Sequence, residues 1–104
     1  MPASQREPRN ADRRGVVLRL VVRNHPGVMS HVCGLFARRA FNVEGIVCLP
    51  VGDGARSAIL LLVRDDERLE QLIRQLRKLE DVVAIARVRD GRAPFAAVER
   101  YLQE

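Results

Sequence analysis

The side chains best able to do chemistry are concentrated in the segment VRNHPGVMSHVCGLFARRA, which holds both histidines and one of the two cysteines. A metal site needs three or four converging ligands, yet His25 and His31 are six residues apart and neither shares a helix face with Cys33. Cys33 falls on the apolar side of the predicted helix, where nothing nearby would activate a thiol as a nucleophile. The spacing therefore argues against a metal centre and against a Cys-His hydrolase.

The backbone around Asn24-His25-Pro26-Gly27 offers a different chemistry, the binding of a small molecule. A helix that starts here presents unpaired N–H groups from Gly27, Val28 and Met29 at the positive end of its dipole, which suits a carboxylate. Gly27 has no side chain to block the approach, and the side-chain carbonyl of Asn24 can accept from an ammonium group. Such a turn can hold an α-amino acid.

The same four residues also make an ordinary strand-to-helix connection. In that interpretation Asn24 or His25 caps the helix and nothing binds. On local spacing alone, this second interpretation is favoured over the binding site.

Two elements position the turn. Leu18, Leu20 and Val22 alternate with polar or outward-facing residues, which predicts a strand with one buried face from Val16. Pro26 ends that pattern and suits a first helical turn. Apolar residues at spacings of three and four then predict an amphipathic helix to about Ala40.

The rest of the chain continues with a hairpin, a helix and a strand. Residues 43–51 and 57–64 are apolar runs separated by the turn Gly52-Asp53-Gly54. Asp65, Asp66 and Glu67 precede a leucine-rich period of three and four, which predicts a second helix. Residues 82–88 form a last strand, and residues 94–103 a short, helical tail.

This β-α-β-β-α-β order predicts an α+β ferredoxin-like fold: a four-stranded antiparallel sheet with two helices on one face. Val21, Val47 and Leu49 are expected on the opposite face, leaving apolar surface for a partner. The second strand is expected at an edge of the sheet, where it can pair with another copy. We therefore expect a homodimer.

The length of 104 residues fits one domain, with a flexible polar leader over residues 1–15, a folded domain over 16–89 and a tail over 90–104. The apolar runs are too short to span a membrane, and the leader lacks the apolar centre of a signal peptide. Cys33 and Cys48 match no zinc or redox spacing and are expected to be buried thiols rather than a disulfide, as in a reducing cytoplasm.

The net charge of +5 invites a nucleic-acid interpretation, but the basic residues are spread along the chain and give no functional indication. RNA-recognition motifs share this element order and stack bases on aromatic residues of the inner strands. The predicted strands contain no Phe, Tyr or Trp, since the aromatics are Phe36, Phe41, Phe95 and Tyr101. Neither a nucleic acid nor a membrane is therefore the expected partner.

Two longer stretches carry a family resemblance. NHPGVMSHVCGLFARRAFNVEGIVCLPV and ILLLVRDDERLEQLIRQLRKLEDVV closely resemble the small regulatory subunits of acetolactate synthase (acetohydroxyacid synthase), in particular the short, single-domain isozyme I type. The resemblance covers residues 16–88 and not the leader or the tail.

The resemblance implies an ACT domain, a βαββαβ module that binds amino acids. The family's small subunits are not catalytic. They bind the large subunit of this transferase, which carries thiamine diphosphate, Mg²⁺ and FAD, raise its activity, and confer feedback inhibition by valine in branched-chain amino-acid biosynthesis. No cofactor is expected on this chain. An ACT regulator of another enzyme is the alternative that the resemblance leaves open.

The family's binding positions match Asn24 and Gly27, with the neighbouring amides of Val28 and Met29, and Asn42 at the start of the second strand. In ACT dimers the ligand lies between domains, so the resemblance implies that Asn42 serves a turn of the other chain. The candidate valine-binding residues are Asn24, His25, Gly27, Val28, Met29, Asn42, Val43 and Ile46.

Overall fold

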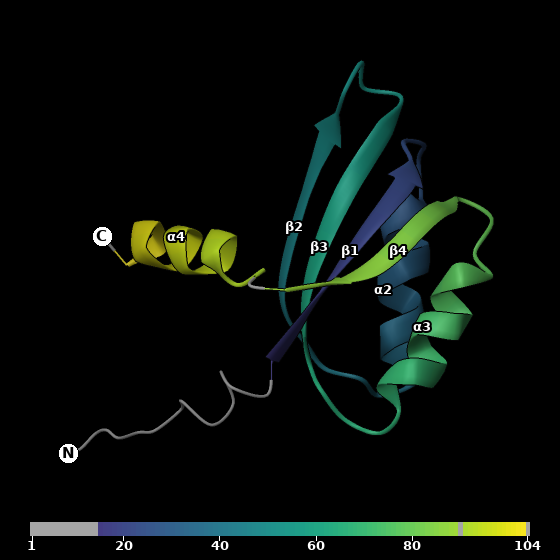
Figure 1. Ribbon diagram of the computed structural model, residues 1–104. Coiled ribbons are helices and arrows are strands. Elements are labelled where there is room, and N and C mark those ends of the chain that lie inside the picture. The colour runs from purple at the N-terminus through teal and green to yellow at the C-terminus, as the bar shows by residue number, and fades with distance from the viewer. Residues whose placement is uncertain (1–14, 90, 104) are drawn as a thin grey trace.

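The structure is a computed structural model that describes residues 15–89 and 91–103 (Figure 1). The elements in chain order are β1 (Gly15–Arg23), α2 (Val28–Arg38), β2 (Val43–Val51), β3 (Arg56–Arg64), α3 (Leu69–Arg77), β4 (Val82–Val88) and α4 (Ala93–Leu102). Apart from Gly15, which opens β1, the predicted leader lies outside the described residues.

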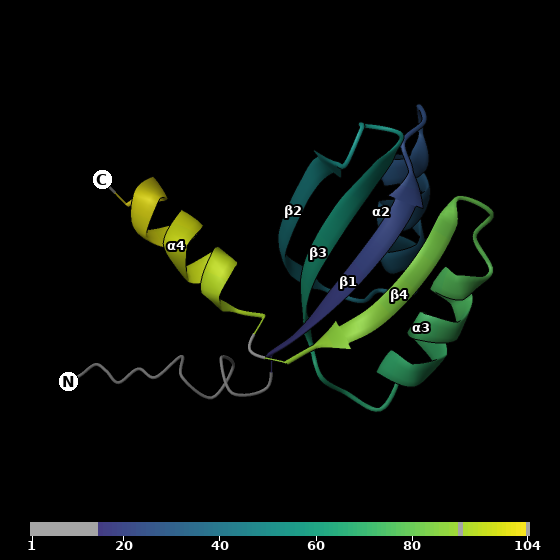
Figure 2. The ribbon, with the colours of Figure 1, turned by 45° about the horizontal axis from the view of Figure 1, so that its top comes forward.

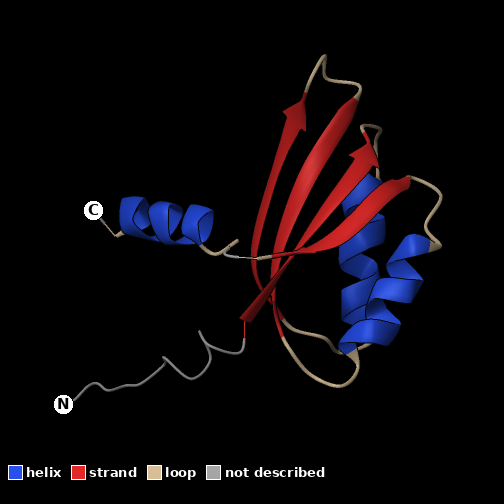
Figure 3. Ribbon diagram, in the orientation of Figure 1, coloured by secondary structure: helices blue, strands red, loops and turns tan. Residues whose placement is uncertain are grey.

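The four strands form one antiparallel sheet in the order β2-β3-β1-β4, so β2 and β4 are its edges. Helices α2 and α3 cover one face, and α4 lies on the other side (Figures 1 and 3). This arrangement confirms the predicted ferredoxin-like fold. No helix among the described residues is both long and apolar enough to cross a bilayer.

The core lies between the sheet and the two helices. Leu18, Leu20 and Val22 of β1 point to the helix face, opposite Leu61, Ile59 and Ser57 of β3, and all of these residues are buried. The alternation predicted for the first strand is therefore confirmed. The helices contribute Val28, Val32, Leu35 and Phe36 from α2, and Leu69, Leu72, Ile73 and Leu76 from α3.

The connection between α2 and β2 is stabilised by contacts from α2 itself and from the start of α3. Ala40 takes a left-handed conformation at φ 52°, and the Phe41 N–H donates to the Phe36 carbonyl at 2.9 Å. The rings of Phe36 and Phe41 meet edge to face at 6.0 Å. The Arg68 guanidinium lies over the Phe41 ring, 4.9 Å from its centroid, and donates to the Arg39 carbonyl. The start of α3 therefore fixes the end of α2.

Helix α3 begins after the acidic segment predicted to precede it. The Arg68 N–H donates to Asp66 Oδ1 at 2.7 Å. That backbone hydrogen bond, helped by the Arg68 guanidinium, holds the pKa of Asp66 below its ordinary value. These acids lie in the turn before the helix, which begins at Leu69, the first residue of the predicted leucine period.

The open face of the sheet is only partly exposed. Val21 and Val47 are half-buried there and Leu49 is exposed, as predicted. Val17 and Leu62, however, are buried on this face, at 2% and 8% exposed. They are covered because the chain after β4 turns back across the sheet (Figure 2).

Two glycines mark that return of the chain. A Cβ at Gly91 would lie 2.9 Å from Val17, and a Cβ at Gly45 would lie 2.8 Å from the Phe95 ring. Helix α4, predicted for the tail, buries none of its own residues. It is therefore attached to the sheet mainly through Phe95.

The prediction that both cysteines are buried is wrong. Cys33 and Cys48 are free thiols, and both are exposed. Cys48 points to the helix face from the edge strand β2, beyond the cover of α2, as does Ile46 beside it. The apolar neighbours of Cys48 in the sequence therefore mark an uncovered edge, whereas Cys33 is exposed although its neighbour Val32 belongs to the core.

Candidate functional site

The predicted turn is built around Gly27, which caps α2 at φ 91° and ψ −9°. This left-handed conformation is one that L side chains rarely adopt, which explains the glycine physically. The Val28 N–H donates to the His25 carbonyl at 3.3 Å, whereas no hydrogen bond among the described residues engages the N–H of Gly27 or Met29. Those two donors at the helix N-terminus are therefore the best placed to meet an anion.

Asn24 is held by two hydrogen bonds to the loop between β2 and β3. Its backbone N–H donates to the Ala55 carbonyl at 3.0 Å, and its side-chain Nδ2 donates to the Gly54 carbonyl at 2.9 Å. The amide nitrogen is thus used within the protein, which leaves the side-chain oxygen as the atom that can accept from a ligand ammonium.

His25 is directed toward the α3–β4 connection. Its Nε2 lies 3.1 Å from Asp81 Oδ2, and its Nδ1 lies 2.7 Å from the Pro26 carbonyl oxygen. Both partners are acceptors, so both contacts are hydrogen bonds only when the imidazole carries two protons. The ring therefore lies between the turn and Asp81, with an acceptor atom of the protein beside each ring nitrogen.

Asn42, Val43 and Ile46 lie at the other end of α2. Asn42 is exposed and directly precedes β2. Val43 and Ile46 line an apolar groove of about 260 Å³ between α2 and β2, together with Phe36 and Cys33. This groove is open at the edge of the sheet.

A single chain does not bring the two groups of candidate residues together. The turn is at the N-terminal end of α2 and Asn42 follows its C-terminal end, so an 11-residue helix of about 16 Å separates them. Val28 belongs to the core at 7% exposed, and Met29 is half-buried against it. Neither of these side chains reaches the groove beside Ile46.

These two groups of residues offer chemistry suited to the recognition of a small molecule. One offers hydrogen-bond donors and an acceptor at a helix N-terminus, and the other offers an apolar groove. Among the described residues, no three His, Cys, Asp or Glu side chains gather to hold a metal ion. The arrangement suits a small zwitterion with an apolar side chain.

The sequence matches the family described as an AHAS small subunit-like ACT domain over residues 18–84, where AHAS is acetohydroxyacid synthase. It is 57% identical over 94 residues to the acetolactate synthase isozyme 1 small subunit of Escherichia coli K12, covering 90% of this chain and 98% of that protein. The chain belongs to the acetolactate synthase small-subunit family. This result confirms the resemblance seen in the sequence.

Other members of the family are longer. The isozyme 3 small subunit of Escherichia coli K12 is 35% identical over 81% of this chain, which spans 50% of that protein. The crystal structure of the acetolactate synthase small subunit from Thermotoga maritima aligns with a TM-score of 0.67 and 34% identity, over 73% of this chain and 48% of that one. The ACT domain of the GTP pyrophosphokinase of Chlorobium tepidum, at 23% identity and a TM-score of 0.58, shares the fold.

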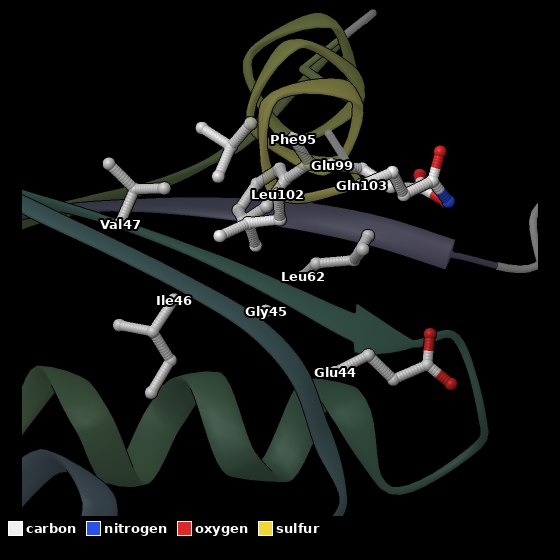
Figure 4. Close-up of a pocket in the computed structure, with 10 residues that line it drawn as sticks. Glu44, Gly45, Ile46, Val47, Leu62, Phe95, Glu99, Leu102 and Gln103 are labelled. Atoms are coloured by element: carbon white, nitrogen blue, oxygen red, sulfur yellow. The ribbon is translucent and has the colours of Figure 1, made fainter.

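Sequence reasoning did not foresee a second cavity, of about 360 Å³, between α4 and the start of β2. Figure 4 shows Phe95 and Leu102 of α4 on the same side of the sheet as Leu62 and Val47, with Ile46 on the opposite side. The apolar residues at helical spacing in the tail were the signal for it. The sequence could not show where that helix would dock.

Proposed function

We propose that this chain is the non-catalytic regulatory subunit of an acetolactate synthase. It binds valine at a site shared between two copies, raises the activity of the catalytic large subunit in the cytoplasm, and confers feedback inhibition on it. The observation that carries the proposal is the Gly27 turn, with two unengaged N–H donors beside the Asn24 amide, in a chain of this family.

The exposed edge of β2 supports the homodimer in this proposal. Within the described part of the chain this strand pairs only with β3, so its other side presents backbone donors and acceptors. Antiparallel pairing with β2 of a second copy, about a two-fold axis perpendicular to the sheet, satisfies them and makes an isologous interface. The pairing reverses the direction of the second chain.

The reversal brings the turn at Gly27 of one chain and Asn42 of the other chain to the same end of the dimer. The turn lies where β1 ends and Asn42 lies where β2 begins, at opposite ends of the sheet in one chain. In the dimer, the turn of one chain therefore lies at the end that carries the partner's Asn42. This geometry supports a site that is incomplete in a monomer.

In the proposed site, the carboxylate of valine accepts from the N–H groups of Gly27 and Met29, and its ammonium donates to the Asn24 side-chain oxygen. The apolar groove at Val43 and Ile46 receives the isopropyl group from the partner's side. His25 helps to position the turn through its contact with Asp81 in the α3–β4 connection.

Regulation requires that valine bind one state of the assembly more tightly than another. A ligand with equal affinity for both states would leave their populations unchanged. The reaction belongs to branched-chain amino-acid biosynthesis. Its thiamine diphosphate, Mg²⁺ and FAD belong to the large subunit, so this chain's part is to bind the effector and the large subunit.

The first prediction tests the carboxylate position with Gly27→Asp. A Cβ at Gly27 meets nothing within 4 Å, so the added side chain has room, and the cost comes from the left-handed backbone. An aspartate there opposes the valine carboxylate, and titration calorimetry should show valine affinity reduced by about tenfold or more, equivalent to about 1.4 kcal/mol.

The matched control is Gly27→Asn, which has nearly the same size and tolerates the left-handed conformation but carries no charge. It should retain more of the affinity than Gly27→Asp. Equal valine binding by wild type and Gly27→Asp would contradict the site.

Co-purification with the acetolactate synthase large subunit, with and without valine, tests the partner. Pyruvate turnover by the chain alone would contradict a non-catalytic role. If the chain bound valine but no acetolactate synthase large subunit, it would be an ACT regulator of another enzyme.

A further inference from the structure

Helix α4 has apolar side chains that its own chain leaves exposed. Val98 is 44% exposed and Leu102 is 74% exposed, although both line the cavity against β2 with Phe95. The helix lies on the β2 side of the sheet and projects beyond that edge (Figures 1 and 2). It therefore extends over the place where the proposed dimer puts the second copy.

The open face of β2 carries a matching apolar surface at its other end. Cross-strand neighbours show that Gly45, Val47, Leu49 and Val51 share this face, the one on which α4 lies. Leu49 is 62% exposed and Val51 is also exposed. In one chain, α4 contacts the start of β2 at Gly45, so it leaves Leu49 and Val51 uncovered.

The symmetry of the proposed dimer brings these two surfaces together. Val47 is the middle residue of β2, and antiparallel pairing about it places Gly45 opposite the partner's Leu49. The two residues point to the same face, since each is an even number of positions from Val47. Phe95 on Gly45 thus anchors α4 beside the partner's Leu49.

Charge agrees with this placement. Glu99 lies on the same side of α4 as Phe95 and Leu102, where it lines the same cavity. At the far end of β2, Val51 has Arg56 as its exposed cross-strand neighbour on the open face. In the proposed dimer, the glutamate of one chain and this arginine of the other carry opposite charges on the same face of the sheet.

We infer that α4 is an arm that crosses the β2 seam and packs Val98 and Leu102 on the partner's Leu49 and Val51. The occupant of this surface is a second copy of the chain, and the contact is made twice in each dimer. The inference rests on the homodimer of the proposed function and adds to it the surface that closes the dimer on the open face.

The test is the double substitution Val98→Ser with Leu102→Ser in the full chain. Both side chains are substantially exposed within one chain, so its fold should persist. Sedimentation equilibrium should show the dimer dissociation constant raised by about tenfold or more, as expected when apolar interface residues are truncated. Ala97→Ser, on the side of α4 away from this cavity, is the matched control and should leave it unchanged.

A second measurement reports proximity directly. In a background with Cys33→Ser and Cys48→Ser, a chain with Leu102→Cys is mixed with a chain carrying Leu49→Cys. A covalent heterodimer should form on oxidation, and Ala97→Cys in place of Leu102→Cys should give much less.

The outcomes separate this inference from the proposed function. A wild-type dimer with an unchanged dissociation constant in the double variant and no Leu102–Leu49 cross-link overturns the arm and leaves the valine site standing. A wild-type chain that is monomeric, with or without valine, overturns the homodimer itself.

Discussion

Gly45 is the residue at which α4 meets the sheet. It follows a bulge in β2, and a side chain there would meet the Phe95 ring at 2.8 Å. The missing Cβ therefore makes room for the ring, and the ring in turn covers Leu62. One glycine thus decides whether the tail is docked.

Gly45→Ala should release α4 without unfolding the domain. The added methyl group cannot coexist with the present ring position, and α4 buries no residue that would hold it in place. Hydrogen exchange should show α4 amides losing protection while amides of β1 and β3 keep theirs.

Gly34→Ala is the control for this substitution. Its added methyl group meets only the end of the flexible Arg38 side chain, and alanine in a helix interior is favoured over glycine by roughly 0.5–1 kcal/mol. Protection of α4 that is the same in Gly45→Ala and wild type would show that Phe95 does not anchor the helix.

At the same scale, the sequence suggested candidate residues in the turn but not their contacts. Gly27 was identified because it lacks a side chain, and its left-handed φ adds a second reason. The Asn24 hydrogen bond to Gly54 and the His25 contact with Asp81 join residues far apart in the chain, which no local spacing reveals. The prediction for Cys48 was wrong for a related reason, since a local apolar pattern does not say which edge of a sheet is covered.

Among the elements, α2 has an ending that its sequence does not optimise. Ala40 holds φ 52° just beyond the helix, a position that glycine usually occupies. Two hydrogen bonds fix this ending, from Ala40 N–H to Ala37 and from Phe41 N–H to Phe36. The backbone strain at Ala40 is therefore held by the packing of Phe41.

Ala40→Gly should stabilise the domain. Relief of the left-handed conformation stabilises the folded glycine variant by roughly 1–2 kcal/mol. The greater conformational freedom of glycine in the unfolded chain offsets about 0.4–1 kcal/mol of this gain. The free energy of unfolding in urea should rise by about 0.5–1 kcal/mol.

The same substitution inside the helix gives a control of opposite sign. Ala37→Gly should lower the free energy of unfolding by about 0.5–1 kcal/mol, since residue 37 lies within α2. If both variants were destabilised equally, the conformation at Ala40 would carry no strain.

All seven elements were predicted from periodicity and turn residues, because apolar spacing is a local signal that this fold obeys throughout. Their bounds differ by one to a few residues at the turns. The return of the chain across the open face was not predicted, since it depends on the fit of Phe95 against Gly45 and of Gly91 against Val17.

For the whole molecule, the separation of the turn from Asn42 means that the proposed site requires two chains. The turn and the groove lie at opposite ends of α2, so in the proposed homodimer each valine would need Gly27 from one chain and Asn42 from the other. A defect in either residue removes both sites of a homodimer. A mixed dimer of two different defective chains, however, contains one turn and one Asn42 that are both intact and that face each other.

Complementation between Gly27→Asp and Asn42→Ala chains should therefore restore binding. Each variant alone should bind valine poorly, whereas a mixture refolded together should contain heterodimers with one working site. Calorimetry on heterodimers isolated with two different affinity tags should give about one valine per dimer at close to wild-type affinity. A site built from one chain gives the opposite result, because every chain in the mixture then carries a defect and no binding returns.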